Sequence, residues 1–184
     1  MKKSLLILVS AACCISATCG GRELLRNAGF YEAGINKRVV PRWWDVKSAD
    51  KIPAEIKVKM NKAKHELQLH FPGGKGIVET HFYRILCSSL DKEMDYQLTI
   101  TGTGKGSVEL KFHTYNDKGA FLKTIDIANF AFDNGASVTL EGLPEKLSGA
   151  VRFMPAFYIA AKNCTLSGIS LKSVKKKAVS NQAK

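Results

Sequence analysis

Residues 96–113, with the sequence YQLTITGTGKGSVELKFH, decide the fold class of this chain. Apolar and polar side chains alternate over 96–101 and again over 108–113, and glycines lie between the two halves. An alternation with this period is typical of β-strands that bury one face and expose the other. We therefore predict two strands here, joined by a turn at 102–104, where glycine tolerates a positive φ angle.

The same alternation continues through most of the chain. Turn sequences separate the alternating segments, with Pro-Gly-Gly at 72–74, Asn-Asp-Lys-Gly at 116–119 and Asn-Gly at 134–135. No amphipathic helical segment of convincing length occurs, and single helical turns are predicted only at 22–26 and 144–147. These patterns predict an all-β fold, an antiparallel two-sheet β-sandwich with minor single-turn helices. The further strands are predicted over 55–60, 66–71, 77–87, 121–127, 137–140, 151–158 and 165–174.

The N-terminus has the composition of a secretory signal peptide. Lys2 and Lys3 precede an apolar run over 5–15, and small residues follow up to Gly20. The run is shorter than the roughly 20 apolar residues that span a bilayer. We predict that residues 1–20 are a signal peptide and that the protein is exported to the periplasm, the cell surface or the medium. The alternative is a buried N-terminal helix. The β-sandwich domain would then cover 21–174, and a disordered basic tail would cover 175–184.

The chain is strongly basic, with a formal net charge of +12 at pH 7. Such a charge would favour nucleic acid as the partner of a cytoplasmic protein, but the predicted export argues against nucleic acid. Outside the cytoplasm the anionic partners are lipid head groups, acidic polysaccharides and cell-wall polymers. Part of the excess charge lies in the tail. The tail is either a solvated end that aids solubility or a peripheral tether to an anionic membrane or envelope surface.

Only two of the five cysteines, Cys87 and Cys164, lie beyond the predicted signal peptide. In an oxidising compartment they are candidates for one disulfide. The alternative is two buried free thiols, because cysteine is often a small core residue. Lipid anchoring is not favoured, because Cys13 and Cys19 both have a serine three positions before them, where a lipoprotein signal has a branched aliphatic residue.

Two short elements precede the first predicted strand. Residues 27–32 read Asn-Ala-Gly-Phe-Tyr-Glu, and residues 41–45 read Pro-Arg-Trp-Trp-Asp. Together with the order of the later strands and turns, they resemble jelly-roll carbohydrate-binding modules of the galactose-binding-like superfamily. The resemblance covers most of the domain and implies a jelly-roll sandwich that binds carbohydrate. Because adjacent side chains point to opposite sides, one of Trp43 and Trp44 is predicted to be in the core.

The resemblance also implies a structural calcium ion, for which Glu32 is the candidate ligand. Two departures from the family pattern weaken this implication. Tyr31 stands between the phenylalanine and Glu32, and Ser167 and Gly168 occupy the closing strand where the family commonly has an aspartate. Calcium requires several oxygen ligands. We therefore predict no cofactor beyond this one weakly supported ion.

Sugar binding in such modules uses aromatic rings that stack on sugar faces, helped by neighbouring polar side chains. His113 and Tyr115 are predicted to point outward with the charged residues of their strand, as are Arg152 and Tyr158. Arg84 lies in a segment whose two faces are both mixed, so its direction stays open. The predicted carbohydrate-binding residues are Trp43, Arg84, His113, Tyr115, Arg152 and Tyr158.

No catalytic motif fits the sequence. His65, Glu66 and His70 superficially match a zinc-protease helix, but the second histidine comes one residue too late and the segment alternates as a strand. Gly-x-Ser-x-Gly and phosphate-binding glycine loops are absent from the sequence. We predict an exported, non-catalytic module that binds a polysaccharide or cell-envelope glycan. The alternative is a protein-interaction module of the envelope with the same fold, and a third hypothesis is a membrane-surface binder acting through the tail.

Overall fold

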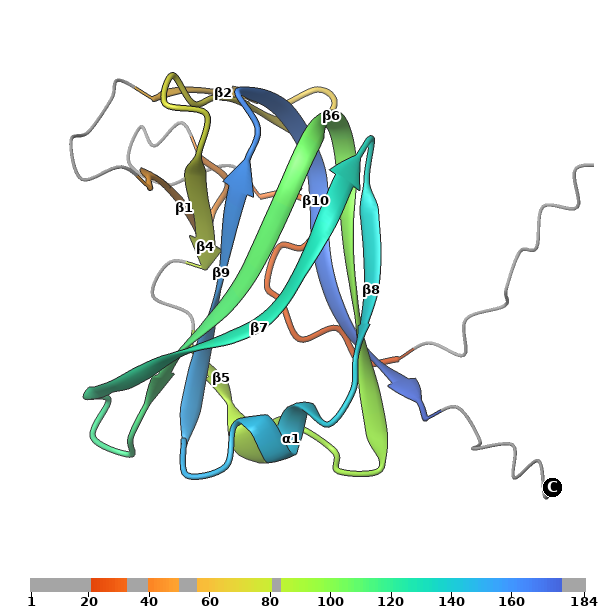
Figure 1. The fold of residues 1–184 in the computed structure, drawn as a ribbon. Helices are drawn as coiled ribbons and strands as arrows, with labels where there is room; N and C mark the ends of the chain where they lie inside the picture. Colours follow the sequence, from red (N-terminus) through yellow and green to blue (C-terminus); the bar gives the residue numbers. More distant parts are fainter. Residues whose placement is uncertain (1–20, 33–39, 50–55, 81–83, 177–184) are drawn as a thin grey trace, which may run out of the picture.

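The chain folds as an antiparallel β-sandwich (Figure 1). The computed structural model describes residues 21–32, 40–49, 56–80 and 84–176. The predicted signal peptide and the end of the predicted tail therefore lie outside the described residues. The elements are β1 (Trp44–Ser48), β2 (Lys57–Asn61), β3 (Glu66–His70), β4 (Gly76–Thr80), β5 (Ile85–Leu86), η1 (Cys87–Ser89), β6 (Met94–Tyr115), β7 (Phe121–Asp133), β8 (Ala136–Leu140), α1 (Leu143–Lys146), β9 (Arg152–Ala160) and β10 (Asn163–Lys175).

Two sheets share the long strand β6. The first has the order β2-β3-β10-β6-β8, and the second has the order β1-β4-β9-β6-β7, with β5 also paired to β9. All of these pairings are antiparallel. The predicted all-β, two-sheet sandwich is confirmed.

β6 forms a corner between the sheets. Residues 94–104 pair with β10 in the first sheet, whereas residues 107–115 pair with β9 in the second. The two strands predicted over 96–101 and 108–113 are therefore one strand that bends, and the turn predicted at 102–104 is that bend (Figure 1). Gly104 has a φ of +129°, which only glycine adopts without strain.

Two other predictions are corrected by the structure, and one strand was not predicted. The sequence pattern does not predict β1, because its five residues alternate over too short a length. The strand predicted over 77–87 is divided into β4 and β5, and residues 81–83 between them lie outside the described residues. Residues 22–26 form no helical turn; Glu23 pairs instead with Lys172 of β10. The helical turn predicted at 144–147 is confirmed as α1, one residue earlier.

Inward-pointing residues of both sheets form one core. Leu98 and Ile100 from the first half of β6 and Phe112 from the second half are each almost completely buried, as the alternation predicted. Phe112 stacks on Phe153 of β9 with ring centroids 4.8 Å apart. Among the described residues, no helix has the length and apolar composition that a membrane-spanning helix requires.

The segment before β1 closes the sandwich. The backbone N–H of Leu24 donates to the carbonyl of Leu171 at 2.9 Å, so this segment runs beside the part of β10 that β3 does not reach. Phe30 is fully buried and packs edge-on against Trp44, with centroids 5.5 Å apart. Trp44 is thus the core member of the tryptophan pair. The Asn27 side chain binds the backbone of Glu32 through both its oxygen and its amide nitrogen, which fixes the loop.

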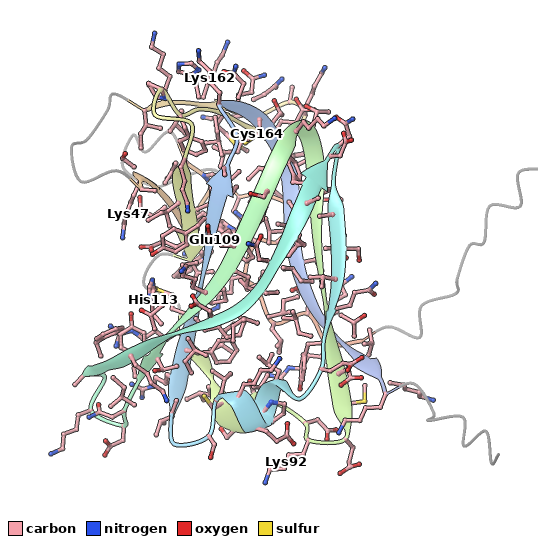
Figure 2. All side chains as sticks on the ribbon, viewed as in Figure 1. Lys47, Lys92, Glu109, His113, Lys162 and Cys164 are labelled. Carbon is pink, nitrogen blue, oxygen red and sulfur yellow. The ribbon has the colours of Figure 1, made fainter. Side chains whose placement is uncertain are left out.

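Cys87 and Cys164, the two candidates for a disulfide, are not bridged in the structure. Both cysteines are free thiols. Cys87 follows β5 at one end of the sandwich, whereas Cys164 lies near the start of β10 at the opposite end (Figures 1 and 2). A disulfide requires Cα atoms no more than about 7 Å apart. Cys164 pairs with Gly104, whereas Cys87 is hydrogen-bonded to Val151, which is hydrogen-bonded to Tyr115 at the far end of β6. The alternative of two free thiols is therefore the observed one.

Candidate functional site

The outer surface of the second sheet gathers most of the chain's functional candidates. Strand register sets which side chains share this surface, because residues paired across an antiparallel sheet point to the same side. Glu109 pairs with Tyr158, and Tyr115 pairs with both Arg152 and Phe121. We call this surface the β9 face and define it by Lys47, Glu79, Glu109, Lys111, His113, Tyr115, Phe121, Thr124, Asp126, Arg152 and Tyr158.

A network of ion pairs occupies the middle of the β9 face. The ammonium group of Lys75, from the loop before β4, lies 2.8 Å from the Glu109 carboxylate. Lys111 lies 3.5 Å from Glu109 and 2.8 Å from Asp126. The hydrogen bond from Lys75 holds the pKa of Glu109 below its ordinary value, and the hydrogen bond to Asp126 raises the pKa of Lys111. Both groups are therefore charged at neutral pH.

A second ion pair lies nearer the edge of the same face. Glu79 of β4 is only 6% exposed, although it carries a carboxylate. It is hydrogen-bonded to the ammonium group of Lys47 on β1, the neighbouring strand. Burial lowers the pKa of Lys47, but the Glu79 carboxylate outweighs that effect and raises it overall. Figure 2 shows Lys47 and Glu109 on the same side of the sandwich, with His113 further along the face.

Tyr158 presents an aromatic ring within this charged network. The ammonium groups of Lys75 and Lys111 lie 5.9 and 5.3 Å from the centre of its ring. Cations at this distance are attracted to the ring by its quadrupole. Because both lysines are also bound to Glu109, the positions of the ring, the ammonium groups and the carboxylate are mutually fixed.

A second aromatic group lies where β6 and β7 join. The guanidinium of Arg84 stacks 3.8 Å from the centre of the Tyr115 ring and donates to the carbonyl of Gly119 at 2.9 Å. Tyr115 is only 8% exposed, so its ring is covered. Phe121 packs edge-on against Tyr115, with centroids 6.0 Å apart, and is 58% exposed. The accessible ring at this end of the face is therefore Phe121.

His113 lies between these two groups. Its Nδ1 atom is 2.9 Å from the hydroxyl of Thr124 on β7. Burial lowers the pKa of His113, and the nearby Lys47 and Lys111 act in the same direction against the opposing effect of Glu79. The imidazole is consequently neutral at pH 7 and offers one donor and one acceptor.

Comparison with known proteins identifies the fold. No family model and no curated protein matches the sequence. A family 11 carbohydrate-binding module from Clostridium thermocellum, solved with a β-1,3-1,4-mixed-linked tetrasaccharide, is similar with a TM-score of 0.52 and 12% identity, over 88% of this chain and 100% of that module. A cyclase from Fischerella sp. is similar to the same degree, with a TM-score of 0.52, 12% identity and the same coverage of 88% and 100%. The chain has the jelly-roll fold of carbohydrate-binding modules.

Other solved structures are similar to a lower degree. A tailspike protein of bacteriophage CBA120 is similar with a TM-score of 0.49 and 10% identity, and the match covers 83% of this chain but 21% of the tailspike. Further carbohydrate-binding modules are also among the similar structures. At these identities the likeness is one of fold alone.

The structure brings five of the six predicted site residues together. His113, Tyr115, Arg152 and Tyr158 share the β9 face as the alternation predicted, and the open question about Arg84 is resolved in favour of the same surface. Whether these residues bind carbohydrate stays a prediction. Tyr115 differs from the expectation, because the Arg84 guanidinium covers its ring and keeps it from solvent.

Trp43 lies apart from the other five predicted residues. Its ring is contacted by two guanidinium groups, those of Arg26 at 5.0 Å and Arg42 at 4.7 Å from the ring centre. Trp43 also has a φ of 71°, in the loop that precedes β1. Cations therefore contact this ring, as they do that of Tyr158, but no described contact joins Trp43 to the other five predicted residues.

The residues around Glu32 do not fit a calcium ion. Its carboxylate forms an ion pair with the Arg42 guanidinium at 3.1 Å, so a cation is already present at this position. The carboxylate of Glu23, the nearest acidic residue along the chain, is bound to the hydroxyl of Ser170 and to two backbone N–H groups. Within the described part of the chain, no group of three or more His, Cys, Asp or Glu side chains could hold a metal.

Sequence reasoning missed several members of the β9 face. Phe121 could have been found, because a tight turn at 116–119 places the aromatic residues on either side of it opposite each other. The ion pairs of Lys47, Lys75 and Asp126 could not, since each joins strands or loops whose neighbours the sequence does not reveal.

Proposed function

We propose that the protein is a glycan-binding module and that the glycan lies along the β9 face. The observation that carries this proposal is that the half-buried ring of Tyr158, the exposed ring of Phe121 and a row of fixed polar side chains share one sheet surface. Aromatic rings stack on the apolar faces of sugars, and charged groups make strong hydrogen bonds to hydroxyls. The jelly-roll fold supports the proposal, since carbohydrate-binding modules share it.

The arrangement suits an extended chain of several sugars. Tyr158 lies opposite Glu109 of β6, and Phe121 lies opposite Tyr115 of the same strand. Glu109 and Tyr115 are about 20 Å apart along β6. Lys111 and His113 fall between these positions and would supply hydrogen bonds to sugar hydroxyls. A ligand would therefore contact a ring near each end and polar groups in between.

The charge of the middle of the face favours neutral sugars. Lys75 and Lys111 are paired with Glu109 and Asp126, and Lys47 is paired with Glu79. Because these opposite charges balance, an acidic glycan would gain little attraction there and would meet the carboxylates. The preference for acidic polymers that the net charge predicted is therefore not expected of this face.

Binding assays on ring variants test the proposal. We expect Tyr158→Ala and Phe121→Ala each to weaken binding of mixed-linked β-glucan, or of the best ligand in a glycan array, by about tenfold or more. Affinity electrophoresis or calorimetry measures the change. Tyr31→Ala is the matched control, because Tyr31 is 74% exposed and lies outside the β9 face. No binding of any glycan by the unaltered protein, or equal losses in all three variants, would contradict the proposal.

We also propose that the module is exported and does not cleave its ligand. Export is supported by the composition of residues 1–20 alone and predicts that the N-terminus isolated from cells begins near Gly21. The lowered pKa of Glu109 argues against this carboxylate as the general acid of a glycosidase, because a general acid needs a raised pKa. We expect no release of reducing ends from a bound glycan.

A second candidate is a protein-binding module of the cell envelope. Four large apolar side chains that are exposed lie around one end of the sandwich, namely Leu86, Phe121, Leu122 and Val151. Such a patch is typical of contact surfaces. A pull-down from envelope extract that recovers one defined protein would favour this function, provided that Leu86→Ser and Val151→Ser abolish the recovery and Tyr158→Ala does not.

The third hypothesis is that the basic tail tethers the protein to a membrane. It predicts that deletion of 175–177 abolishes binding to anionic liposomes.

A further inference from the structure

The first sheet has a groove on its outer surface, on the opposite side of the sandwich from the β9 face. The groove has a volume of about 540 Å³ and lies where β2, β3 and β10 run side by side. Strand register orders its side chains into two rows across the sheet. We call it the basic groove; its rows are Lys57, His70 and Asn163, and Lys59, Gln68 and Thr165.

The basic groove carries positive charge without internal compensation. Lys57 and Lys59 are both exposed and, being two residues apart on one strand, point to the same side at a Cα separation of about 7 Å. No described residue that lines the groove is acidic. Within the described part of the chain, neither ammonium group has an ion-pair or hydrogen-bond partner. Both ammonium groups are therefore free to bind an anion.

The lysines of the β9 face, in contrast, are paired with carboxylates. Two of the carboxylates come from neighbouring strands. Lysine side chains are thus paired with carboxylates on the β9 face and left unpaired in the basic groove. This difference in charge between the two surfaces predicts a neutral ligand for the β9 face and an anionic ligand for the first sheet.

Neutral polar groups complete the groove. The Nδ1 atom of His70 lies 2.6 Å from the side-chain oxygen of Asn163, which fixes the ring by accepting a hydrogen bond and leaves Nε2 as its other polar atom. Gln68, Thr103 and Thr165 add an amide and two hydroxyls along the second row. Such groups bind the hydroxyls that a sugar chain presents beside its acidic groups. A glycan that bears acidic groups can bind both the lysines and the neutral polar side chains.

We propose that the basic groove binds an acidic glycan, in which carboxylate or sulfate groups pair with Lys57 and Lys59 while hydroxyls bond to the neutral row. This site is separate from the β9 face and does not depend on it.

Retention on immobilised polysaccharides tests the groove, with the full chain in low salt. Polygalacturonate provides carboxylates, heparin provides sulfates, and dextran is the neutral control. We expect retention on at least one acidic polymer, and Lys57→Gln with Lys59→Gln to weaken it by about tenfold. Lys57→Arg with Lys59→Arg should retain binding. Lys62→Gln with Lys64→Gln is the matched control, because it removes the same charge from the adjoining turn, outside the groove.

Three results would overturn the acidic-glycan site in the basic groove. Equal losses in the two glutamine double variants would show a diffuse charge effect. Retention on neither acidic polymer would overturn the site as well, as would lysine-dependent binding confined to vesicles of anionic phospholipid. Because Tyr158→Ala lies on the other sheet, it should leave acidic-glycan binding unchanged, so failure of the glycan site on the β9 face would be distinguishable from failure of the groove.

Discussion

His113 is surrounded by groups from four strands. Thr124 of β7 contacts its ring, Glu79 of β4 and Lys47 of β1 act on it through charge, and Lys111 comes from its own strand β6. Burial is the largest cause of its lowered pKa. A neutral imidazole is thus part of the folded state, and protonation opposes folding at this position.

We predict that His113 makes the protein less stable as the pH falls. The unfolded chain takes up this proton below a pH of about 6.5, whereas the folded chain takes it up only at lower pH, so acidification favours unfolding in that window. His113→Gln should therefore flatten the dependence of the free energy of unfolding on pH between about 7 and 5. Urea denaturation at several pH values measures this dependence. If the free energy of unfolding changed with pH equally in the variant and the unaltered protein, His113 would not be the group responsible.

The two cysteines should behave as unlinked thiols. Cys164 is 5% exposed, and burial raises its pKa to about 11. Since the thiolate is the reactive form, we expect Cys164 to resist alkylation at pH 8 until the protein unfolds. Peptide mapping without reduction should recover Cys87 and Cys164 in separate peptides. A cross-linked pair of these peptides would contradict the structure.

At the scale of elements, the bend of β6 couples the two sheets. Gly102 and Gly106 flank the bend, and an added Cβ atom would lie 2.1 Å from the carbonyl oxygen of Thr165 at the first and of Ala160 at the second. The two glycines therefore let β6 approach β10 on one side of the corner and β9 on the other.

We predict that Gly106→Ala lowers the free energy of unfolding by about 1–3 kcal/mol, because the methyl group must displace β9. Gly74→Ala is the comparison, since Gly74 has a φ of +80° but open space around it. Only the backbone cost, about 1 kcal/mol, should appear there. Denaturant titration measures both, and a smaller effect at Gly106 than at Gly74 would show that the corner can relax.

At the scale of the whole molecule, the segment before β1 completes the core. Phe30 contacts Trp44, and Trp44 in turn packs near Phe157 of β9 with ring centroids 6.2 Å apart. The same segment is hydrogen-bonded to β10 through Leu24 and Ala28. It thereby joins the part of β10 that β3 leaves unpaired to the core residues of the second sheet.

We predict that Phe30→Ala costs about 3–5 kcal/mol, because it leaves a cavity beside Trp44. Tyr31→Ala, at the next and largely exposed position, should change stability by less than about 0.5 kcal/mol. Denaturation followed by tryptophan fluorescence measures both. A small effect of Phe30→Ala would mean that the segment is not needed to close the core.

Local alternation was sufficient to predict the all-β class, most strands and the outward direction of His113, Arg152 and Tyr158, because a two-residue period records which side of a strand meets water. Hairpin geometry could also have paired Tyr115 with Phe121.

Contacts between distant segments decided the rest. The ion pairs of the β9 face, the free lysines of the basic groove, the cover of Arg84 over Tyr115 and the separation of Cys87 from Cys164 all depend on which strands become neighbours. Which strands lie side by side is decided when the two sheets pack around one core, and a short stretch of sequence does not contain that information.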